Sequence, residues 1–566
     1  MQNVISRAEN STSPTNPAKP KPRTNLLVAY LLATSIALPA AAQTAGTYVV
    51  TNLVSDGSVS ATITDPNFIN PWGVTNSTFW INTQATGLDY VIAPTNFPPF
   101  TPPATPAIAF KISIPAATGG TTATGQPSGA ASTGSATGFL LPAPNSTKAT
   151  FLFASLDGII TGWNSKLGTG GAVAQVVINN NAASAEYTGL ALVTNTNGTY
   201  LLAANFGKGS DIEVYDSTFA PAKLAGTFTD PTLPAGYVPF SVHTIGTQVF
   251  VAYALRSATT GGPTSAPGDG LVNIFDTSGN FVAHAVTTGS NLNAPWGVAV
   301  APTTFGVFGG DILVGNFGDG VINVFDPKTF AYLGQLTDGT GKTIVNPSLW
   351  EIFFGLTAPS SANGGNLNTL YFAAGLTGEK HGLLAAVNTN PTATGTATFG
   401  FSASAPAITV SDGSSVPLIV SAVPTNNFSG TVTLACSNLP LAAKCSFSPA
   451  QLTVTSGAPA PSTVTISTVK NSASLSPSTR SGAAASAITA ALLLPFAAIL
   501  TFSRRRQLNI RLFALFAVLV LSAGLIAGCS NTSNAAPFTP TGSTPVTIKA
   551  TSGPITQSTV VNLTVQ

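Results

Sequence analysis

Residues 45–400 repeat one pattern of apolar and polar positions. Each copy holds a short apolar run, a turn rich in Gly, Asn or Asp, and a second run in which apolar and polar residues alternate, which is the pattern of a β-hairpin. The six copies begin at Phe79, Phe151, Leu201, Val249, Asp311 and Leu370. We expect them to form blades in a closed ring, which leaves only short, protected strand edges. An open β-solenoid is the alternative, but the copies are too long and too hairpin-like for it.

A second signature precedes several copies, with a small or aromatic residue ahead of a short apolar strand. It occurs at Asn70–Val74, Tyr187–Leu190, Val238–Val242, Ala294–Val298 and Leu349–Gly355. Such residues suit the innermost strand of a blade, where backbones crowd the axis. The sequence therefore predicts a six-bladed β-propeller over residues 45–400. The Pro-, Thr-, Gly- and Ala-rich range 101–148 is expected to be a flexible insertion between the first two blades.

Apolar and polar residues also alternate over residues 405–470. This range resembles the Ig-like repeats of bacterial surface proteins, whose architecture is an all-β sandwich. The tail, residues 529–566, ends in an alternating stretch from Thr544 to Val565 that looks like the last hairpin of such a domain. The tail is therefore a candidate to complete the sandwich begun at residue 405.

The chain has three cysteines, too few for a disulfide scaffold. Cys436 and Cys445 stand at the ends of a short turn, and we expect a disulfide between them outside the cell; two free thiols are the alternative. Cys529 follows a lipobox-like sequence but lies far from the N-terminus. We expect it to be an ordinary cysteine at a membrane edge, with lipidation only after a prior cut.

Residues 1–42 have the pattern of a signal peptide. A basic stretch ending at Arg23 precedes the apolar run Leu26–Leu38, and Ala40–Ala42 supplies small residues for cleavage. A retained membrane anchor is the alternative, although the run is short for a span. We therefore expect the rest of the chain to be exported.

Two apolar runs, Ala483–Phe502 and Leu512–Gly528, flank the basic cluster Arg504–Arg506. Each is near the length of about 20 residues that crosses a bilayer core, and the basic cluster is expected in the cytoplasm. The runs predict a two-helix transmembrane hairpin over residues 483–528, with an extracytoplasmic tail. A pair of buried core helices and a processed sorting tail are the alternatives.

Composition narrows the classes of fold and function. Only 7% of the 566 residues are Asp, Glu, Lys or Arg, against about 25% in typical domains, and the net charge is +2. With no basic block in the middle of the chain, we expect no nucleic-acid partner. Few charges also disfavour amphipathic surface helices. The predicted fold class is all-β, a six-bladed β-propeller plus a small Ig-like β-sandwich, with two C-terminal transmembrane helices.

Several stretches of the repeat region carry a family resemblance. They are Asn52–Asp56, Asp65–Gly73, Asn293–Ala299, Leu313–Gly320, Asp326–Pro327, Leu349–Trp350, Phe354–Gly355, Asn368–Phe372 and Glu379–Leu383. From about Tyr48 to Gly400 the chain resembles a family of secreted bacterial proteins of uncharacterised function, related to NHL-type six-bladed propellers. The resemblance implies the fold, and the family has no assigned reaction to transfer.

Candidate metal ligands are few and scattered. The three histidines, His243, His284 and His381, form no metal-spaced cluster. Glu379 lies two residues before His381, and on a strand the two side chains would share a face and meet. A turn pair that only orders a loop is the alternative.

Two asparagines, Asn205 and Asn316, occupy the same place in two repeats and are followed by turn carboxylates. Propellers of the gluconolactonase type bind a metal at the axis through carboxylates and Asn residues. Asn205, Asn316, Glu379 and His381 are therefore weak candidates for a metal site, although repetition favours a structural turn role first. A divalent metal is the one cofactor left open.

Two classes of function compete. The first is a non-catalytic binding or adhesion scaffold for protein or polysaccharide, on an exported, membrane-anchored chain in the cell envelope. It fits the Ig-like range, the expected membrane anchor and the scattered positions of the candidate metal ligands. The second is a metal-dependent hydrolase or lactonase at the propeller axis, which rests on fold analogy alone. The sequence names no catalytic residue.

Overall fold

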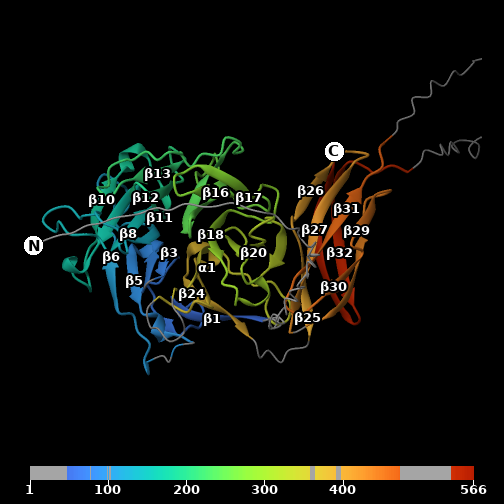
Figure 1. Cartoon of the computed structure of the whole chain (residues 1–566), viewed down its shortest axis with the longest axis horizontal. Helices are drawn as coiled ribbons and strands as arrows, with labels where there is room; N and C mark the ends of the chain where they lie inside the picture. Colours follow the sequence, from blue (N-terminus) through green and yellow to red (C-terminus); the bar gives the residue numbers. More distant parts are fainter. Residues whose placement is uncertain are drawn as a thin grey trace, which may run out of the picture. The chain divides into compact units, whose positions relative to one another are not determined.

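The computed structural model describes most of the chain from residue 47 onward (Figure 1). The described ranges are 47–76, 78–98, 100, 103–356, 364–390, 397–426, 428–471 and 537–566. Regular structure within them is almost entirely β. The exceptions are the helix α1 (Leu376–Glu379) and the 3₁₀ turns η1 (Gln84–Thr86), η2 (Pro94–Asn96), η3 (Ser165–Leu167), η4 (Asn181–Ala183) and η5 (Gly306–Phe308).

Six sheets of the described chain follow one another between residues 47 and 390, and we call them blades 1 to 6. Blade 1 contains β3 (Pro71–Asn76), β4 (Phe79–Thr83), β5 (Leu88–Ile92) and β6 (Phe110–Ser113). Blade 2 contains β7 (Pro127–Ser132), β8 (Phe151–Ser155), β9 (Ile159–Trp163) and β10 (Gln175–Asn179). Blade 3 contains β11 (Tyr187–Asn195), β12 (Gly198–Asn205) and β13 (Ile212–Tyr215).

The remaining blades continue the same order of strands. Blade 4 contains β14 (Tyr237–Ile245), β15 (Gln248–Leu255), β16 (Leu271–Asp276) and β17 (Phe281–Val286). Blade 5 contains β18 (Pro295–Val300), β19 (Ile312–Asn316), β20 (Ile322–Phe325) and β21 (Tyr332–Gln335). Blade 6 contains β22 (Leu349–Phe354), β23 (Leu370–Ala374), β24 (Leu383–Asn390), β1 (Thr47–Ser55) and β2 (Ile63–Thr64).

The blades form a closed ring. The first strands of the blades, β3, β7, β11, β14, β18 and β22, each contact the next, and β22 contacts β3. The start of the chain closes the last blade, because β1 pairs antiparallel with β24 from Thr47↔Asn390 to Ser55↔Leu383. One ladder of backbone hydrogen bonds therefore joins the two ends of the ring. This is the arrangement of a β-propeller, and it matches the all-β, propeller-like architecture expected from the repeats.

Glycine lets the innermost strands approach one another closely. A Cβ atom on Gly73 would lie 2.6 Å from the backbone oxygen of Ser128, and a Cβ atom on Gly297 would lie 2.6 Å from that of Trp350. Neither distance leaves room for a side chain, so these positions require glycine. The small-residue part of the strand signature thus marks the crowded axis of the ring.

The range 101–148 differs from the expected flexible insertion. It contains β6, the outer strand of blade 1, and β7, the innermost strand of blade 2. The small residues of β7 resemble a low-complexity segment, but they suit the axis: a Cβ atom on Gly129 would lie 2.7 Å from the backbone nitrogen of Leu190. Composition alone therefore did not predict β7, a strand that the packing of the ring requires.

Two further sheets of the described chain share one aliphatic core and form a sandwich. The four-stranded sheet has the order β25 (Thr398–Ala403), β27 (Ser415–Thr425), β31 (Ala460–Ser467) and β29 (Lys444–Ser448). The five-stranded sheet has the order β26 (Ala407–Val410), β33 (Ile555–Val565), β32 (Gly542–Ser552), β28 (Gly430–Ser437) and β30 (Gln451–Val454). Val420 and Val464 of the first sheet and Val432 and Val561 of the second are fully buried in the shared core.

The C-terminal tail supplies two of the sandwich strands. β32 pairs antiparallel with β28, from Thr433↔Thr551 to Ser437↔Thr547, and β33 pairs parallel with β26. The tail hairpin therefore lies inside the sheet to which the 405–470 range contributes its other strands. Figure 1 shows this association as red strands among orange ones.

The fold class is corrected in one respect, and the predicted transmembrane hairpin is withdrawn. No helix in the ranges that the structure describes is long and apolar enough to cross a membrane. A span needs about 20 apolar residues, whereas α1 has 4. Residues 483–528 themselves lie outside the described ranges, as do the predicted signal peptide at 1–42 and Cys529. The corrected fold class is all-β.

Candidate functional site

The six innermost strands enclose a cavity of about 480 Å³, which we call the axial cavity. Every blade lines it, and residues two positions after the tight strand contact recur in the lining: Thr75, Ala131, Ala191, His243, Ala299 and Phe353. Val, Leu, Ile and Ala line it together with the hydroxyl side chains of Thr75, Ser132 and Thr244, so the wall is mixed, apolar and polar. A concave space that combines apolar walls with a few fixed polar groups is the usual form of a small-molecule site.

Aromatic side chains close the axis at the starting end of the innermost strands. We call Trp72, Phe240, Trp296, Phe317 and Trp350 the aromatic cap. The rings of Trp72 and Trp350 stack with centroids 3.5 Å apart, and Phe317 stacks on Trp350 at 4.2 Å. Trp350 Nε1 donates to Asn70 Oδ1 at 2.8 Å. The cap is therefore a packed, hydrogen-bonded layer.

The exposed fraction of the residues rises toward the other end of the innermost strands. Val242 and Val298 are buried in the ring, whereas Ile245 is half-buried, Val300 is 36% exposed and Gly246 is exposed. All five residues line the axial cavity. The cavity is thus closed by the aromatic cap and open toward solvent at the strand ends.

The described residues that line the cavity include one ionisable pair, His243 on β14 and Glu351 on β22. Nδ1 of His243 lies 3.6 Å from Oε1 of Glu351, and each side chain is 12% exposed. Two strands that are distant in sequence therefore place an imidazole and a carboxyl group side by side in the cavity wall.

Hydrogen bonds fix the orientation and the tautomer of His243. Its Nε2 lies 3.0 Å from the backbone oxygen of Trp296 and 3.2 Å from Oγ of Ser241. A carbonyl oxygen only accepts hydrogen bonds, so Nε2 carries the proton and donates it. Nδ1 of the neutral ring is then a bare acceptor that faces Glu351.

Burial keeps both members of the pair uncharged. Loss of hydration lowers the pKa of His243 to about 4, against the opposing effect of the Trp296 carbonyl. Burial also raises the pKa of Glu351 well above its usual value, although the backbone at Ile352 and Val74 favours the carboxylate. Burial therefore favours the protonated form of the Glu351 carboxyl group, which donates, beside a neutral imidazole nitrogen, which accepts.

The sequence analysis missed this pair, although the repeats contain a signal for it. Glu351 follows Trp350 at the position where Gly73 follows Trp72 and Gly297 follows Trp296. The registers of blades 2, 3 and 4 place Gly129, Gly189 and Ser241 at the same position, so an ionisable residue there is an exception within the repeat. Such an exception needs aligned strands to be seen, and the aromatic signature alone did not align them.

The predicted candidate Asn205 serves a turn of blade 3. Its Oδ1 accepts from the backbone N–H groups of Glu186 (3.0 Å) and Gly207 (2.9 Å), and its Nδ2 donates to Glu213 Oε1 at 2.8 Å. Asn316, the matching residue of blade 5, donates to the backbone oxygen of Asn291 at 2.8 Å. These contacts tie loops to strands.

Asn316 also donates to Oδ1 of Asp319 at 3.0 Å, and burial raises the pKa of that carboxyl group. Neither Asn205 nor Asn316 lines the axial cavity. A metal role for the two asparagines stays a prediction, and their contacts are those of structural turns.

The predicted partners Glu379 and His381 do not pair with each other. Glu379 Oε2 accepts from Asn70 Nδ2 at 2.9 Å, whereas His381 Nδ1 lies 2.6 Å from Asp56 Oδ2. The reason is local backbone shape: Glu379 ends α1 with φ of 68°, so the two residues are not on a strand and do not share a face. Burial raises the pKa of the Glu379 carboxyl group. Each residue separately links the loop to another part of the chain, Glu379 to Asn70 and His381 to Asp56.

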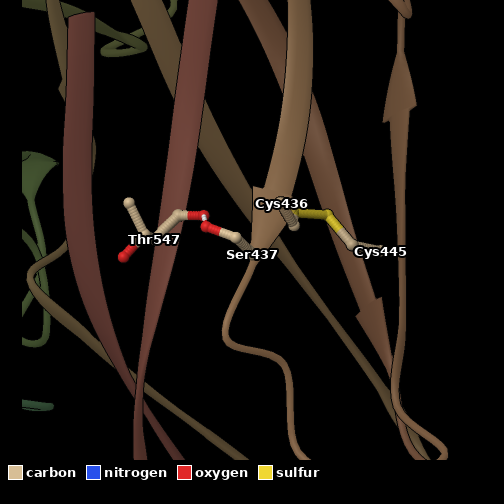
Figure 2. The surroundings of a disulfide bond; sticks show 4 residues. All are labelled: Cys436, Ser437, Cys445 and Thr547. Atoms are coloured by element: carbon tan, nitrogen blue, oxygen red, sulfur yellow. Dashed lines mark hydrogen bonds between the residues drawn. A yellow bond between two sulfur atoms is a disulfide. The ribbon is translucent and has the colours of Figure 1, made fainter.

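A disulfide joins Cys436 and Cys445, the pairing predicted from the sequence, with Cα atoms 6.3 Å apart (Figure 2). Cys436 is on β28 and Cys445 is on β29, so the bond connects the two sheets of the sandwich. Next to it, Ser437 Oγ donates to the backbone oxygen of Thr547 at 3.4 Å, which links β28 to the tail strand β32.

No family model matches the chain. Among curated proteins it is 29% identical over 197 residues to "Uncharacterized protein R640" and 34% identical over 165 residues to "Uncharacterized protein L690", both of Acanthamoeba polyphaga mimivirus. These matches cover 34% and 28% of this chain, and the chain spans 36% and 42% of those proteins. "Uncharacterized protein R648" of the same virus is 29% identical over 313 residues, which is 53% of this chain and 72% of that protein.

Among solved structures, the chain is similar to the PQQ-bound form of aldose sugar dehydrogenase from Streptomyces coelicolor, at 12% identity and a TM-score of 0.34 over 61% of this chain and 100% of that one. It is also similar to a putative 6-phosphogluconolactonase from Bacteroides uniformis, at 13% identity and a TM-score of 0.23 over 42% and 66% of the two chains. Likenesses this low carry no argument about function, so the fold rests on the sheet topology. The curated relatives have names that state no activity, and the function is therefore argued from the site.

Proposed function

We propose that the chain is an exported binding protein that holds a small, largely apolar molecule in the axial cavity. The observation that carries the proposal is the His243–Glu351 pair in the wall of a cavity of about 480 Å³ that aliphatic and hydroxyl side chains line. Ligand cavities commonly measure about 300–1,000 Å³ and combine apolar walls with a few fixed polar groups.

The pair selects the polar group of the ligand. Nδ1 of His243 accepts, and the protonated Glu351 carboxyl group donates. A hydroxyl or primary amide group both donates and accepts, so it satisfies the two protein atoms at once. An alcohol or amide on an aliphatic skeleton of modest size therefore fits the cavity.

The chemistry of the walls favours a small molecule over a polysaccharide. A sugar carries a hydroxyl group on most carbon atoms, and each buried hydroxyl without a partner costs about 1–3 kcal/mol. Beyond the pair, the side-chain hydroxyl groups of Thr75, Ser132 and Thr244 are the polar side chains among the described lining residues, fewer than the hydroxyl groups of an oligosaccharide. A protein partner would bind at the loops of the ring, as loops on a rigid scaffold commonly do.

Export is part of the proposal. The disulfide between Cys436 and Cys445 supports it, because such bonds persist in oxidising compartments. We also propose that the ring is related to NHL-type propellers and that the sandwich is related to Ig-like repeats.

A second candidate is acid–base catalysis in the same cavity. A carboxyl group with a raised pKa beside a bare imidazole nitrogen is a recognised feature of catalytic sites. A metal-dependent hydrolase is less favoured, since Asn205, Asn316 and Glu379 do not line the cavity.

The test uses the purified full-length chain and 1-hexanol, hexanamide and hexyl methyl ether as probes. The alcohol and the amide should raise the midpoint of thermal unfolding, and the ether, which only accepts, should have a weaker effect. The response should be lost in Glu351→Gln with His243→Leu and kept in Glu379→Gln beside the aromatic cap. An equal response of the cavity double variant and the wild type, or none to any probe, would contradict the proposal. Turnover of hexanamide that requires both residues would favour the catalytic candidate.

A further inference from the structure

A second cavity, of about 230 Å³, has residues of both the ring and the sandwich in its wall, and we call it the Asp319 cavity. The ring contributes Asn291, Asp319 and Gln335, and the sandwich contributes Ser402 and Val560. Asp319 is the only ionisable residue among the described residues of this wall. None of them lines the axial cavity, so the Asp319 cavity is a separate candidate site.

Three N–H groups hold the carboxyl group of Asp319 in place. Asn316 Nδ2 donates to Oδ1 at 3.0 Å, and the backbone nitrogen of Val321 donates to the same oxygen at 3.3 Å. Asn293 Nδ2 donates to Oδ2 at 3.3 Å. Burial raises the pKa of Asp319, whereas these N–H donors favour the carboxylate. In the part of the chain that the structure describes, no Lys, Arg or His forms an ion pair with it.

The amide groups of the wall already use their nitrogen atoms within the protein. Asn291 Nδ2 donates to the backbone oxygen of Ala403, and Gln335 Nε2 donates to Asn323 Oδ1 at 3.1 Å. Gln335 Oε1 accepts one hydrogen bond, from Thr343 Oγ1 at 3.3 Å, and an amide oxygen can accept two. The wall is therefore rich in acceptors, with one carboxyl group among them.

A ligand that suits this wall brings positive charge together with hydrogen-bond donors. A primary ammonium group has one charge, three N–H donors and no acceptor. A Ca²⁺ ion takes six to eight oxygen ligands, more than one carboxyl group and its neighbours supply. Val321, Ala405 and Val560 also line the cavity and offer apolar surface to a short alkyl chain.

We propose that the Asp319 cavity binds a small primary alkylammonium ion. The ammonium group donates to Asp319 and to the amide oxygens of the wall, and the alkyl chain packs against the apolar residues. The bound charge also favours the carboxylate form of Asp319. Because the ring and the sandwich both supply the wall, the ion stabilises the contact between them.

The experiment is isothermal titration calorimetry of the full-length chain with n-butylammonium chloride at constant ionic strength. The wild type should bind about one ion per chain. Tetramethylammonium, which has the charge but no N–H group, should bind about tenfold more weakly or less, since a hydrogen bond to a charged group is lost. Asp319→Asn should weaken the binding of n-butylammonium by a similar factor.

A second variant leaves the carboxyl group untouched. Val560 is 55% exposed and lines the cavity, so Val560→Trp should fold normally and weaken binding by narrowing the space. The matched control is Asp326→Asn. Asp326 follows β20 of blade 5 and accepts from the backbone nitrogens of Lys328 (2.9 Å) and Thr329 (2.7 Å), but it does not line the cavity. This control should bind n-butylammonium as the wild type does.

The ammonium group can belong to a free amine or to the lysine side chain of a peptide, and we assign the site to free amines because the cavity is small. Nα-acetyl-lysine methylamide should therefore bind more weakly than n-butylammonium, and tighter binding would overturn that assignment. The whole proposal fails if the wild type binds no n-butylammonium, or if tetramethylammonium binds equally well. It fails equally if Asp319→Asn keeps the affinity of the wild type.

Discussion

At one end of the ring axis, five aromatic side chains pack against one another and exclude water. At the other end, the same six strands surround a cavity that contains His243 and Glu351. Only one residue step separates the two environments, because Trp350 lies in the cap and Glu351 in the cavity wall. Along a strand, successive side chains point to opposite sides. The ring thus concentrates aromatic contacts at the cap and places the His243–Glu351 pair in the cavity wall.

The cap should show the largest effect on stability. Trp350→Ala removes a side chain that is 1% exposed, stacks on Trp72 and donates to Asn70. We expect a loss of about 3–5 kcal/mol in the free energy of unfolding, from lost contacts and the cavity left behind. Urea unfolding measures it. Val300→Ala at the open end is the control and should cost less than about 1 kcal/mol. Equal losses of unfolding free energy in Trp350→Ala and Val300→Ala would contradict the claim that the cap stabilises the ring more than the open end does.

Replacing the His243–Glu351 pair should have the opposite effect on stability to replacing a residue of the cap. Replacing both residues, in His243→Leu with Glu351→Leu, removes two desolvated polar groups and leaves an aliphatic wall. The variant should be as stable as the wild type or up to about 4 kcal/mol more stable. It should no longer respond to 1-hexanol. A marked loss of stability in urea would show that the pair is needed for folding and would weaken the case for a ligand site.

The pH dependence of stability gives a second test of the His243–Glu351 pair. In the proposed site the folded chain has a protonated Glu351 and a neutral His243, the forms that burial favours. In the unfolded chain, between the ordinary pKa values of 4.5 and 6.5, the imidazole is protonated and the carboxyl group is not. Both states then bind one proton, so the pair adds no pH dependence in that window.

Outside that window the two states differ. Above pH 6.5 the unfolded imidazole loses its proton while folded Glu351 keeps its own, so the pair's contribution falls as pH rises. Below pH 4.5 the unfolded carboxyl group gains a proton, and the contribution falls as pH falls. The stability of the wild type minus that of the double Leu variant should therefore decrease from pH 5.5 to pH 8.5. A difference that stays flat from pH 6.5 to pH 8.5 would mean that the folded pair holds no proton in that range, with Glu351 ionised beside a neutral His243.

The hairpins of the ring were predictable because their second and third strands combine apolar runs with Gly- and Asn-rich turns. The copies beginning at Phe79 and Phe151 correspond to β4–β5 and β8–β9. Strands made of small residues were not predictable in this way. β7 consists of Pro, Ser, Gly and Ala, and only contact with its neighbours distinguishes it from a linker.

The site was harder to predict than the fold. His243 and Glu351 lie in apolar strands far apart in sequence, and ring closure brings them together. The predicted ligands Asn205 and Asn316 recur because turns recur, which is a structural reason for repetition. Residues that break the repeat, such as Glu351, are the better guide to function, and they can be recognised only after the strands are aligned in register.

The most direct measurement is the ¹⁵N spectrum of the histidine side chains, because the chain has only three histidines and His243→Leu assigns the relevant one. At pH 7 the account predicts that His243 is neutral, with a proton on Nε2 and none on Nδ1. Addition of 1-hexanol should shift the Nδ1 resonance of His243 and leave His284 and His381 unchanged. An imidazolium at pH 7, or an Nδ1 resonance that responds to neither 1-hexanol nor hexanamide, would contradict the assignment of the axial cavity as a ligand site.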